Sequence, residues 1–338
     1  MAAGVAVGAA VGGPAGVTPT DADAGFAIGV DLGGTKTEAI VLDAAGTEVW
    51  RQRISTPSAQ GYEAMLAALA GLVGQARQAI KHQPASIGVG TPGCMTAAGL
   101  MKNANTQCLN GRPLLRDLQA SLGQPVAIAN DANCLALSEA TDGAGRGAAV
   151  VFAAILGTGT GAGIAVHGRV LTGPNGLAGE WGHNPLPWAA ADEARPACYC
   201  GQVGCIETLV SGPGLAADHQ RRHGGALTAL QIATAASGGD AEFADRADCT
   251  DTLARWQQRL ARALASVINL LDPDVIVLGG GLSRMAGTYA AVPALWDRWV
   301  VSGGQREAVR TRLLPAQHGD SSGVRGAAWL GRSGHLLR

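Results

Sequence analysis

A strand–turn–strand pattern occurs twice in this chain, and the repeat restricts the possible folds more than any other feature of the sequence. In the first copy, turns separate three runs with apolar character: residues 26–30, 38–42 and 48–54. The second copy has the same arrangement: residues 150–156, 163–166 and 169–171. When Gly33 is placed over Gly157, 124 positions later, the glycine-rich turns and the strands after them align without a gap. Each copy predicts an antiparallel meander, and the repeat predicts two lobes of related fold.

Helical and strand patterns alternate after each meander. Four elements are predicted after the first: a helix at 62–80, strands at 86–90 and 126–129, and a helix at 135–139. In the second half, apolar residues from Leu253 to Leu271 recur at helical spacing, and Asp272-Pro273 ends that helix. The sequence DVIVLGGG then predicts a buried strand leading into a glycine turn. The alternation predicts an α/β protein that binds its ligands in a cleft between two lobes.

Composition excludes several classes of protein. The 338 residues are enough for two domains, only 15% of them are charged, and the formal net charge is −1. A nucleic-acid-binding protein is not expected, because the chain has no basic stripe. A membrane protein is not expected either, because no apolar run reaches the ~18 residues that span a bilayer.

Cysteine usage and the N-terminal segment predict a cytoplasmic protein. The seven cysteines are an odd number, and four of them are scattered: Cys94, Cys108, Cys134 and Cys249. A secreted disulfide framework is shorter and denser in cysteine. Residues 1–25 are rich in Ala and Gly, and the first basic residue is Lys36, whereas a signal peptide begins with positive charge. We expect either a disordered tail or a start codon placed too early.

The two glycine-rich turns predict a phosphate site. Glycines let backbone N–H groups approach phosphate oxygens, and Thr35 and Lys36 add a hydroxyl and a charge. A glycine-rich hairpin is usually only a hairpin, but two of them at matching places in duplicated lobes favour a clamp on ATP. The predicted ATP-binding residues of the two turns are Gly33, Gly34, Thr35, Lys36, Gly157, Thr158, Gly159 and Thr160.

Two further features belong to the same prediction. Asp31, at the end of the first strand, could hold Mg²⁺ directly or through water, or it could simply cap the turn. Gly279, Gly280 and Gly281 could pack against the flat base of ATP, or they could simply allow a turn.

Seven motifs, in this order, resemble the ROK family of sugar kinases and sugar-responsive repressors: DLGGTKT, GTPG, NDANC, GTGTGAG, GEWGH, CYCGQVGCIE and DPDVIVLGGG. Three longer stretches resemble the bacterial fructokinases of that family: KNANTQCLNG, AGEWGHNPLPW and HGDSSGVRGAAWL. The resemblance covers residues 26 to about 330. It implies an actin-like (ribonuclease H-like) fold with two lobes and a homodimer. The expected lobes are residues 26–134, completed by a C-terminal helix at 322–335, and residues 135–321, with a zinc-binding loop at 183–205.

Asp131 is the predicted catalytic base. It follows a strand and opens a helix, so it could act as an N-cap, but Asn130-Asp131 is more than one cap needs. The resemblance makes Asp131 the group that accepts the proton of a sugar hydroxyl. It also implies the sugar contacts: Gly93 through its backbone, Asn105, Asn130, Asp131, Glu180, His183 and Glu207. Glu180 and Glu207 could instead be surface acids.

The sequence CYCGQVGC at 198–205 predicts a metal site. Cys198 and Cys200 are too close for a comfortable disulfide, and a redox pair has C-x-x-C spacing. Together with His183, fifteen positions before Cys198, the three cysteines form a Cys₃His set: His183, Cys198, Cys200 and Cys205. ROK kinases have the same pattern as a zinc site. Because four ligands fill the coordination of Zn²⁺, the zinc is expected to be structural; the alternative is free thiols in a loop.

The leading functional hypothesis is a kinase that uses ATP and Mg²⁺ to phosphorylate a hexose at its 6-hydroxyl, with fructose favoured. Glucose, mannose and N-acetylhexosamines are alternative substrates, and N-acetylhexosamines are expected to be poor because no sequence feature supplies an apolar recess for the acetyl group. A repressor of the same family is a second class. It needs an N-terminal helix-turn-helix of roughly 60 residues with basic side chains, and no Lys or Arg precedes Phe26. A sugar-binding protein without catalysis is the third class, and the presence of Asp31, Lys36 and Asp131 argues against it.

Overall fold

The computed structural model describes residues 25–239, 245–285, 287–301, 307–332 and 336–337. The predicted N-terminal tail therefore lies outside the described residues, apart from Gly25. Among the described residues, no helix combines the length and the apolar character that crossing a membrane requires.

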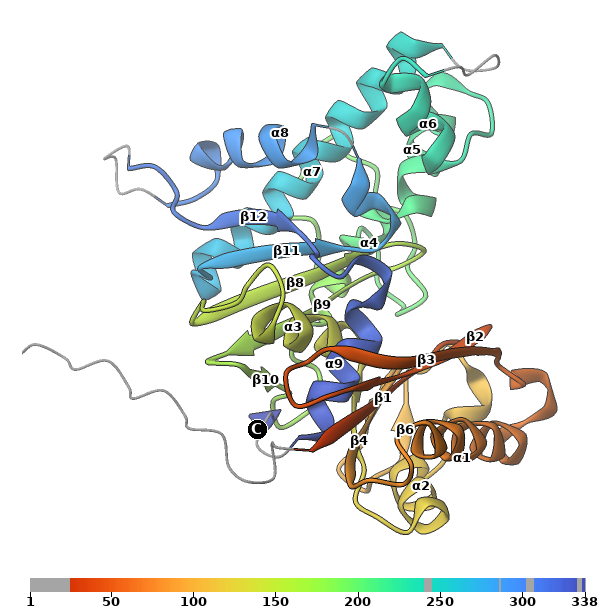
Figure 1. The fold of residues 1–338 in the computed structure, drawn as a ribbon. Coiled ribbons are helices and arrows are strands. Elements are labelled where there is room, and N and C mark those ends of the chain that lie inside the picture. Colours follow the sequence, from red (N-terminus) through yellow and green to blue (C-terminus); the bar gives the residue numbers. More distant parts are fainter. Residues whose placement is uncertain (1–24, 240–244, 286, 302–306, 333–335, 338) are drawn as a thin grey trace, which may run out of the picture.

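Two large sheets form the centres of two lobes (Figure 1). The first sheet has the order β3-β2-β1-β4-β7 and the second β12-β11-β8-β9-β10-β13. The strands of the first sheet are β1 Phe26–Leu32, β2 Lys36–Leu42, β3 Glu48–Ser55, β4 Ala85–Thr91 and β7 Ala127–Asn130. Those of the second are β8 Val150–Leu156, β9 Thr160–Val166, β10 Arg169–Leu171, β11 Val275–Gly279, β12 Arg312–Pro315 and β13 Leu336–Leu337. A separate pair contains β5 Cys94–Met95 and β6 Met101–Lys102.

The topology confirms the predicted repeat. In the first lobe β1 pairs antiparallel with β2 and parallel with β4, which pairs parallel with β7. In the second lobe β8 pairs antiparallel with β9 and parallel with β11, which pairs parallel with β12. The same five-strand unit is therefore present twice, with the same order and the same strand directions.

Helices cover the outer faces of both sheets (Figure 1). The helices are α1 Tyr62–Ala79, α2 Leu114–Leu122, α3 Asp131–Thr141, α4 Glu207–Val210, α5 Gly212–His223, α6 Ala229–Ala236, α7 Arg246–Leu271, α8 Thr288–Ala294 and α9 Ser322–Gly331. Because successive side chains of a strand point to opposite faces, Ile28 and Val30 of β1 join Met65 and Leu69 of α1 in one buried core. The core of the second lobe forms in the same way between β8, β11 and α7.

The long helix α7 agrees with the predicted helical spacing. Asp245 caps its first turn by accepting hydrogen bonds from two backbone N–H groups. At the other end Asp272 adopts a left-handed conformation, and Pro273 prevents the helix from continuing.

Two helices, α3 and α9, lie between the sheets (Figure 1). Helix α9 packs on β1 and β4, α3 packs on β8 and β9, and the two helices pack against each other. A Cβ atom on Gly326 of α9 would lie 1.7 Å from the carbonyl oxygen of Cys134 in α3, so the crossing requires glycine. Helix α9 therefore covers the first sheet, and it ends at Gly331, whereas the C-terminal helix was expected at residues 322–335. The expected lobe boundary after residue 134 falls inside α3, which begins at Asp131 because Asn130 caps it, rather than at residue 135.

Two acids of α3 and its C-terminal end, one buried and one half-buried, join the two places where the chain passes from one lobe to the other. Glu139 of α3 is fully buried, and its carboxylate accepts hydrogen bonds from the backbone N–H of Gln317 and the hydroxyl of Ser322. One turn later, Asp142 binds His318 and Arg325. These bonds connect the C-terminal end of α3 to the segment that leads into α9.

Candidate functional site

The first glycine hairpin lies between β1 and β2 and is supported by the end of β3. The backbone N–H of Gly33 donates to the carbonyl of Lys36 at 3.0 Å, and a Cβ on Gly33 would lie 2.6 Å from that carbonyl oxygen. The Thr56 hydroxyl donates to the Gly33 carbonyl and the Ser58 hydroxyl to that of Gly34. Gly34, Thr35 and Lys36 are exposed, so they are available to a ligand.

The second glycine hairpin, between β8 and β9, contacts Glu207. The Glu207 carboxylate accepts a hydrogen bond from the backbone N–H of Thr160 at 2.9 Å, and a Cβ on Gly159 would lie 2.8 Å from the same oxygen. Gly157 accepts a hydrogen bond from the N–H of Gly212. Thr158 is exposed, whereas the Thr160 side chain is buried. A predicted phosphate residue and a predicted sugar residue are therefore in direct contact here.

Two acids meet at one edge of the first sheet. Asp31 lies near the end of β1 and Asp131 directly follows β7, and the carboxyl ends of these parallel strands share an edge. Burial raises the pKa of Asp31 to about 7, and the nearby charge of Asp131 adds to this effect. Desolvation by the surrounding protein raises the pKa of Asp131, and the charge of Glu180 adds to this effect, although the residue keeps surface that is open to solvent.

Asn130 takes the capping role that was the alternative for Asp131. Its side-chain oxygen accepts a hydrogen bond from the N–H of Ala132 at 2.8 Å, and its amide donates to the Gly93 carbonyl at 3.2 Å. Asp131 Oδ1 also accepts a hydrogen bond from the N–H of Ala132. The structure thus brings three of the predicted sugar residues together: Gly93, Asn130 and Asp131.

Asn105 is exposed beside the first glycine hairpin. Its neighbour Thr106 is buried, and a Cβ on Gly34 would lie 3.3 Å from the Thr106 hydroxyl oxygen. Asn105 therefore lies next to the predicted phosphate residues of the first lobe.

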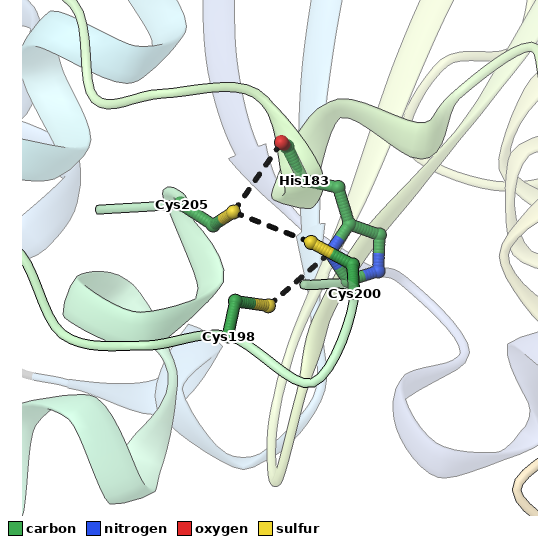
Figure 2. A group of neighbouring side chains, drawn as sticks. All are labelled: His183, Cys198, Cys200 and Cys205. Atoms are coloured by element: carbon green, nitrogen blue, oxygen red, sulfur yellow. Dashed lines mark hydrogen bonds between the residues drawn. The ribbon is translucent and has the colours of Figure 1, made fainter. Parts of the chain in front are cut away.

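The four predicted metal ligands form one cluster (Figure 2). Their ligand atoms all lie within 4.8 Å of one another. Cys200 Sγ lies 3.7 Å from Cys205 Sγ, and Cys198 Sγ lies 3.6 Å from His183 Nδ1. Tetrahedral zinc with bonds of 2.0–2.3 Å requires ligand atoms about 3.5–3.8 Å apart. These two pairs have that separation, and the wider pairs would have to close by up to about 1 Å around the ion.

The other ring nitrogen of His183 points away from this cluster. His183 Nε2 lies 3.0 Å from the hydroxyl of Tyr199 and 4.0 Å from a carboxylate oxygen of Glu180. Glu180 is exposed, whereas Glu207 is half-buried against the second hairpin. His183 can therefore bind a metal on one side and a hydroxyl on the other.

The third glycine tract is largely explained by the backbone. Gly280 has a φ of +80°, and a Cβ there would lie 2.5 Å from the carbonyl oxygen of Leu156. A Cβ on Gly279 would lie 2.9 Å from Leu135, while Gly281 borders open space. The turn accounts for Gly279 and Gly280, and their contact with an ATP base stays a prediction.

Sequence reasoning missed the buried ion pairs behind the metal loop. Arg262 of α7 donates to the carboxylate of Glu193 at 2.6 Å and to the carbonyl of Trp188 at 2.8 Å. Arg259 donates to Glu193 and to Asp218. These two arginines, three positions apart on the buried face of an otherwise amphipathic helix, were the signal that could have indicated partners.

Comparison with known proteins agrees with this geometry. The sequence profile of the ROK family matches residues 27–333. The chain is 40% identical over 315 residues to the N-acetyl-D-glucosamine kinase of Pectobacterium atrosepticum, covering 91% of this chain and 98% of that protein. It is 38% identical over 311 residues to an N-acetylgalactosamine kinase of a Shewanella species, covering 90% and 96%.

Solved structures agree as well. The ROK hexokinase from Thermus thermophilus matches with a TM-score of 0.76 and 31% identity, covering 90% of this chain and 97% of that one. A ROK family glucokinase from Streptomyces griseus, solved with glucose and AMPPNP, matches with a TM-score of 0.71 and 28% identity, covering 92% and 100%. The chain therefore belongs to the ROK family and has the actin-like, two-lobed α/β fold of its sugar kinases.

Proposed function

We propose that this protein is an ATP-dependent hexose kinase that phosphorylates the 6-hydroxyl of N-acetylglucosamine. The observation that carries the proposal is the position of Asp131. Asp131 is the first residue of α3, and its carboxylate interacts electrostatically with Asp31 of the first lobe. The charge of Glu180, from the second lobe, contributes to the raised pKa of Asp131. A base in this position lies between the residues expected to bind ATP and those expected to bind the sugar.

Asp131 would act as the general base. A sugar hydroxyl is a poor nucleophile at neutral pH, so a carboxylate that accepts its proton speeds the transfer. The bond from the sugar oxygen to the γ-phosphorus forms while the bond from that phosphorus to the β–γ bridging oxygen breaks, which releases ADP. The raised pKa of Asp131 suits this role, because the carboxylate then holds the proton more readily.

The two hairpins would bind the phosphates from opposite lobes. The exposed Gly34, Thr35 and Lys36 offer backbone N–H groups, a hydroxyl and a positive charge, and Thr158 is exposed on the other hairpin. Asp31 supplies the kind of oxygen ligand that Mg²⁺ prefers. When bound, Mg²⁺ would neutralise part of the negative charge of the ATP phosphates.

The Cys₃His cluster would hold a structural zinc ion. Its four ligands come from the ends of one loop, and that loop has Glu180 and His183 at one end and Glu207 just after the other. Fixing the loop would therefore fix the wall that is expected to bind the sugar.

The choice of acceptor follows the relatives named above. The three stretches that favoured fructose leave that preference unconfirmed, whereas relatives near 40% identity are N-acetylhexosamine kinases. We therefore make N-acetylglucosamine the first candidate and keep fructose as the second. The homodimer and the cytoplasmic location stay predictions.

An ADP-release assay over a sugar panel tests the proposal. The panel contains N-acetylglucosamine, N-acetylgalactosamine, glucose, mannose and fructose at saturating ATP and Mg²⁺. N-acetylglucosamine should have the highest kcat/KM, and Asp131→Asn should lower kcat with every sugar by about 10²–10⁴-fold. A tenfold preference for fructose would support fructose as the acceptor, as expected from the sequence. If no sugar is turned over, the protein is not a hexose kinase.

A further inference from the structure

Tyr199 is a large aromatic side chain exposed beside the predicted sugar wall. Its side chain is 83% exposed although both neighbours in the chain are predicted metal ligands. The ring meets the ring of His183 edge to face, with centroids 5.1 Å apart and an interplanar angle of 89°. The Tyr199 hydroxyl lies 3.0 Å from His183 Nε2.

The ring of His183 separates the metal cluster from Tyr199. Nδ1 faces the sulfur of Cys198, on the side of the metal cluster, whereas Nε2 faces the Tyr199 hydroxyl. A sugar that approaches His183 from the Nε2 side therefore comes to lie against Tyr199.

The predicted sugar wall is otherwise polar. Its side chains are Asn105, Asn130, Asp131, Glu180, His183 and Glu207. An acetamido group differs from a hydroxyl by an amide and a methyl group, and the methyl gains from contact with apolar surface. The sequence alone offered no apolar feature for it, and the ring of Tyr199 supplies one.

We propose that Tyr199 sets the preference for an N-acetylated hexose over the plain hexose, because its ring contacts the acetamido group. The proposal rests on the proposed function and adds a residue to it.

The backbone around Tyr199 is fixed by its own hydrogen bonds. Cys198 N–H donates to the carbonyl of Gln202 at 2.8 Å, and Gly201 N–H donates to the carbonyl of Cys198 at 3.0 Å. Ala197 and Val203 form a β-bridge that closes this turn, and the contact with the His183 ring orients the Tyr199 side chain. The turn therefore loses little conformational entropy when a ligand binds, so the contact with Tyr199 adds to selectivity.

Three variants test the proposal: Tyr199→Ala, Tyr199→Phe and, as a matched control, Val203→Ala. Val203 is a half-exposed apolar residue of the same turn. For each protein, kcat and KM are measured with N-acetylglucosamine and with glucose, and bound zinc is measured separately. Tyr199→Ala should lower the ratio of kcat/KM for N-acetylglucosamine to that for glucose by about tenfold, mainly through KM.

The other two variants distinguish the effect of the Tyr199 ring from that of its hydroxyl and from that of a change elsewhere in the loop. Tyr199→Phe should keep the wild-type ratio, because it keeps the ring, and Val203→Ala should keep both the ratio and the rates. Zinc content should equal that of the wild type in all three. An unchanged ratio in Tyr199→Ala would overturn the role of Tyr199 while leaving the kinase intact.

Two further outcomes count against the proposal. Loss of zinc in Tyr199→Ala, with equal losses for both sugars, would make Tyr199 a structural residue of the loop. A wild-type protein that turns over neither sugar would refute the proposed function, and the inference with it.

Discussion

Replacing Gly326 by alanine should damage catalysis through the contact between α9 and α3. The new Cβ would lie 1.7 Å from the carbonyl oxygen of Cys134 and 2.4 Å from its carbonyl carbon. Both are backbone atoms, so no side chain can rotate away. The contact becomes acceptable at about 3 Å, so the helices must separate by more than about 1 Å.

The size of the effect follows from where that shift occurs. Forcing a methyl group into a packed core costs about 1–3 kcal/mol of the free energy of unfolding. The gain in helix propensity from Gly to Ala, about 1 kcal/mol, offsets only part of it. Cys134 lies in the same turn of α3 as Asp131. A misplacement of about 1 Å at a reacting group can lower the rate by 10²-fold, so we expect a kcat loss of that order.

Thermal unfolding and the ADP-release assay measure the two effects. Gly71→Ala in α1 is the matched control, because Gly71 is exposed in a helix and a Cβ there would meet nothing within 4 Å. The control should be slightly more stable than the wild type, by up to about 1 kcal/mol, with unchanged kcat. If Gly326→Ala unfolds at the wild-type temperature with wild-type kcat, the reasoning about this helix crossing is wrong.

Four further changes have defined outcomes. Asp131→Ala should fold and bind zinc yet lose about 10²–10⁴-fold in kcat. A kcat within tenfold of wild type would show that Asp131 is not the general base. Cys200→Ser should lower bound zinc, measured by metal analysis, together with the melting temperature; a stable, active variant would contradict the structural zinc. The hydrogen bond with Asp142 raises the pKa of His318. The contribution of this pair to the free energy of unfolding is therefore full below about pH 6.5, and it is lost as the pH rises through the folded-state pKa of His318. His318→Gln should therefore cost about 1 kcal/mol at low pH and little at high pH, by denaturant unfolding. Arg262→Met should lower the free energy of unfolding by about 3 kcal/mol, because it removes one of the positive charges that compensate the buried carboxylate of Glu193. A denaturation midpoint equal to that of the wild type would show that the Arg262–Glu193 pair is not needed for stability.

Local patterns were enough to predict the duplicated sheets. The glycine turns and apolar runs are signals within a few residues, and the observed strands follow them closely, although β9 starts at Thr160 rather than at residue 163. The apolar pattern placed the helix after β7 at residues 135–139, although Asp131 was already expected to open it. In the structure α3 begins at Asp131, since Asn130 supplies the cap.

Contacts between distant residues could not be predicted in the same way. The metal ligands were found because three lie within eight residues and the spacing to His183 is characteristic. Arg262 and Glu193 are 69 positions apart, so the buried face of α7 indicates that Arg262 has a partner but does not identify Glu193 as that partner. The contact between Glu207 and the second hairpin also depends on how α4 packs, which no local pattern encodes.

The position of α9 in the chain has a consequence for biosynthesis. Its side chains Val324, Ala327, Ala328 and Trp329 cover Ala27, Ile40 and Leu42 of the first sheet in one buried cluster. The ribosome makes every strand of that sheet first and then β8 to β12 of the second sheet before it reaches Ser322. The N-terminal lobe therefore emerges with one apolar face uncovered, and it must either wait for α9 or be protected by a chaperone while translation continues.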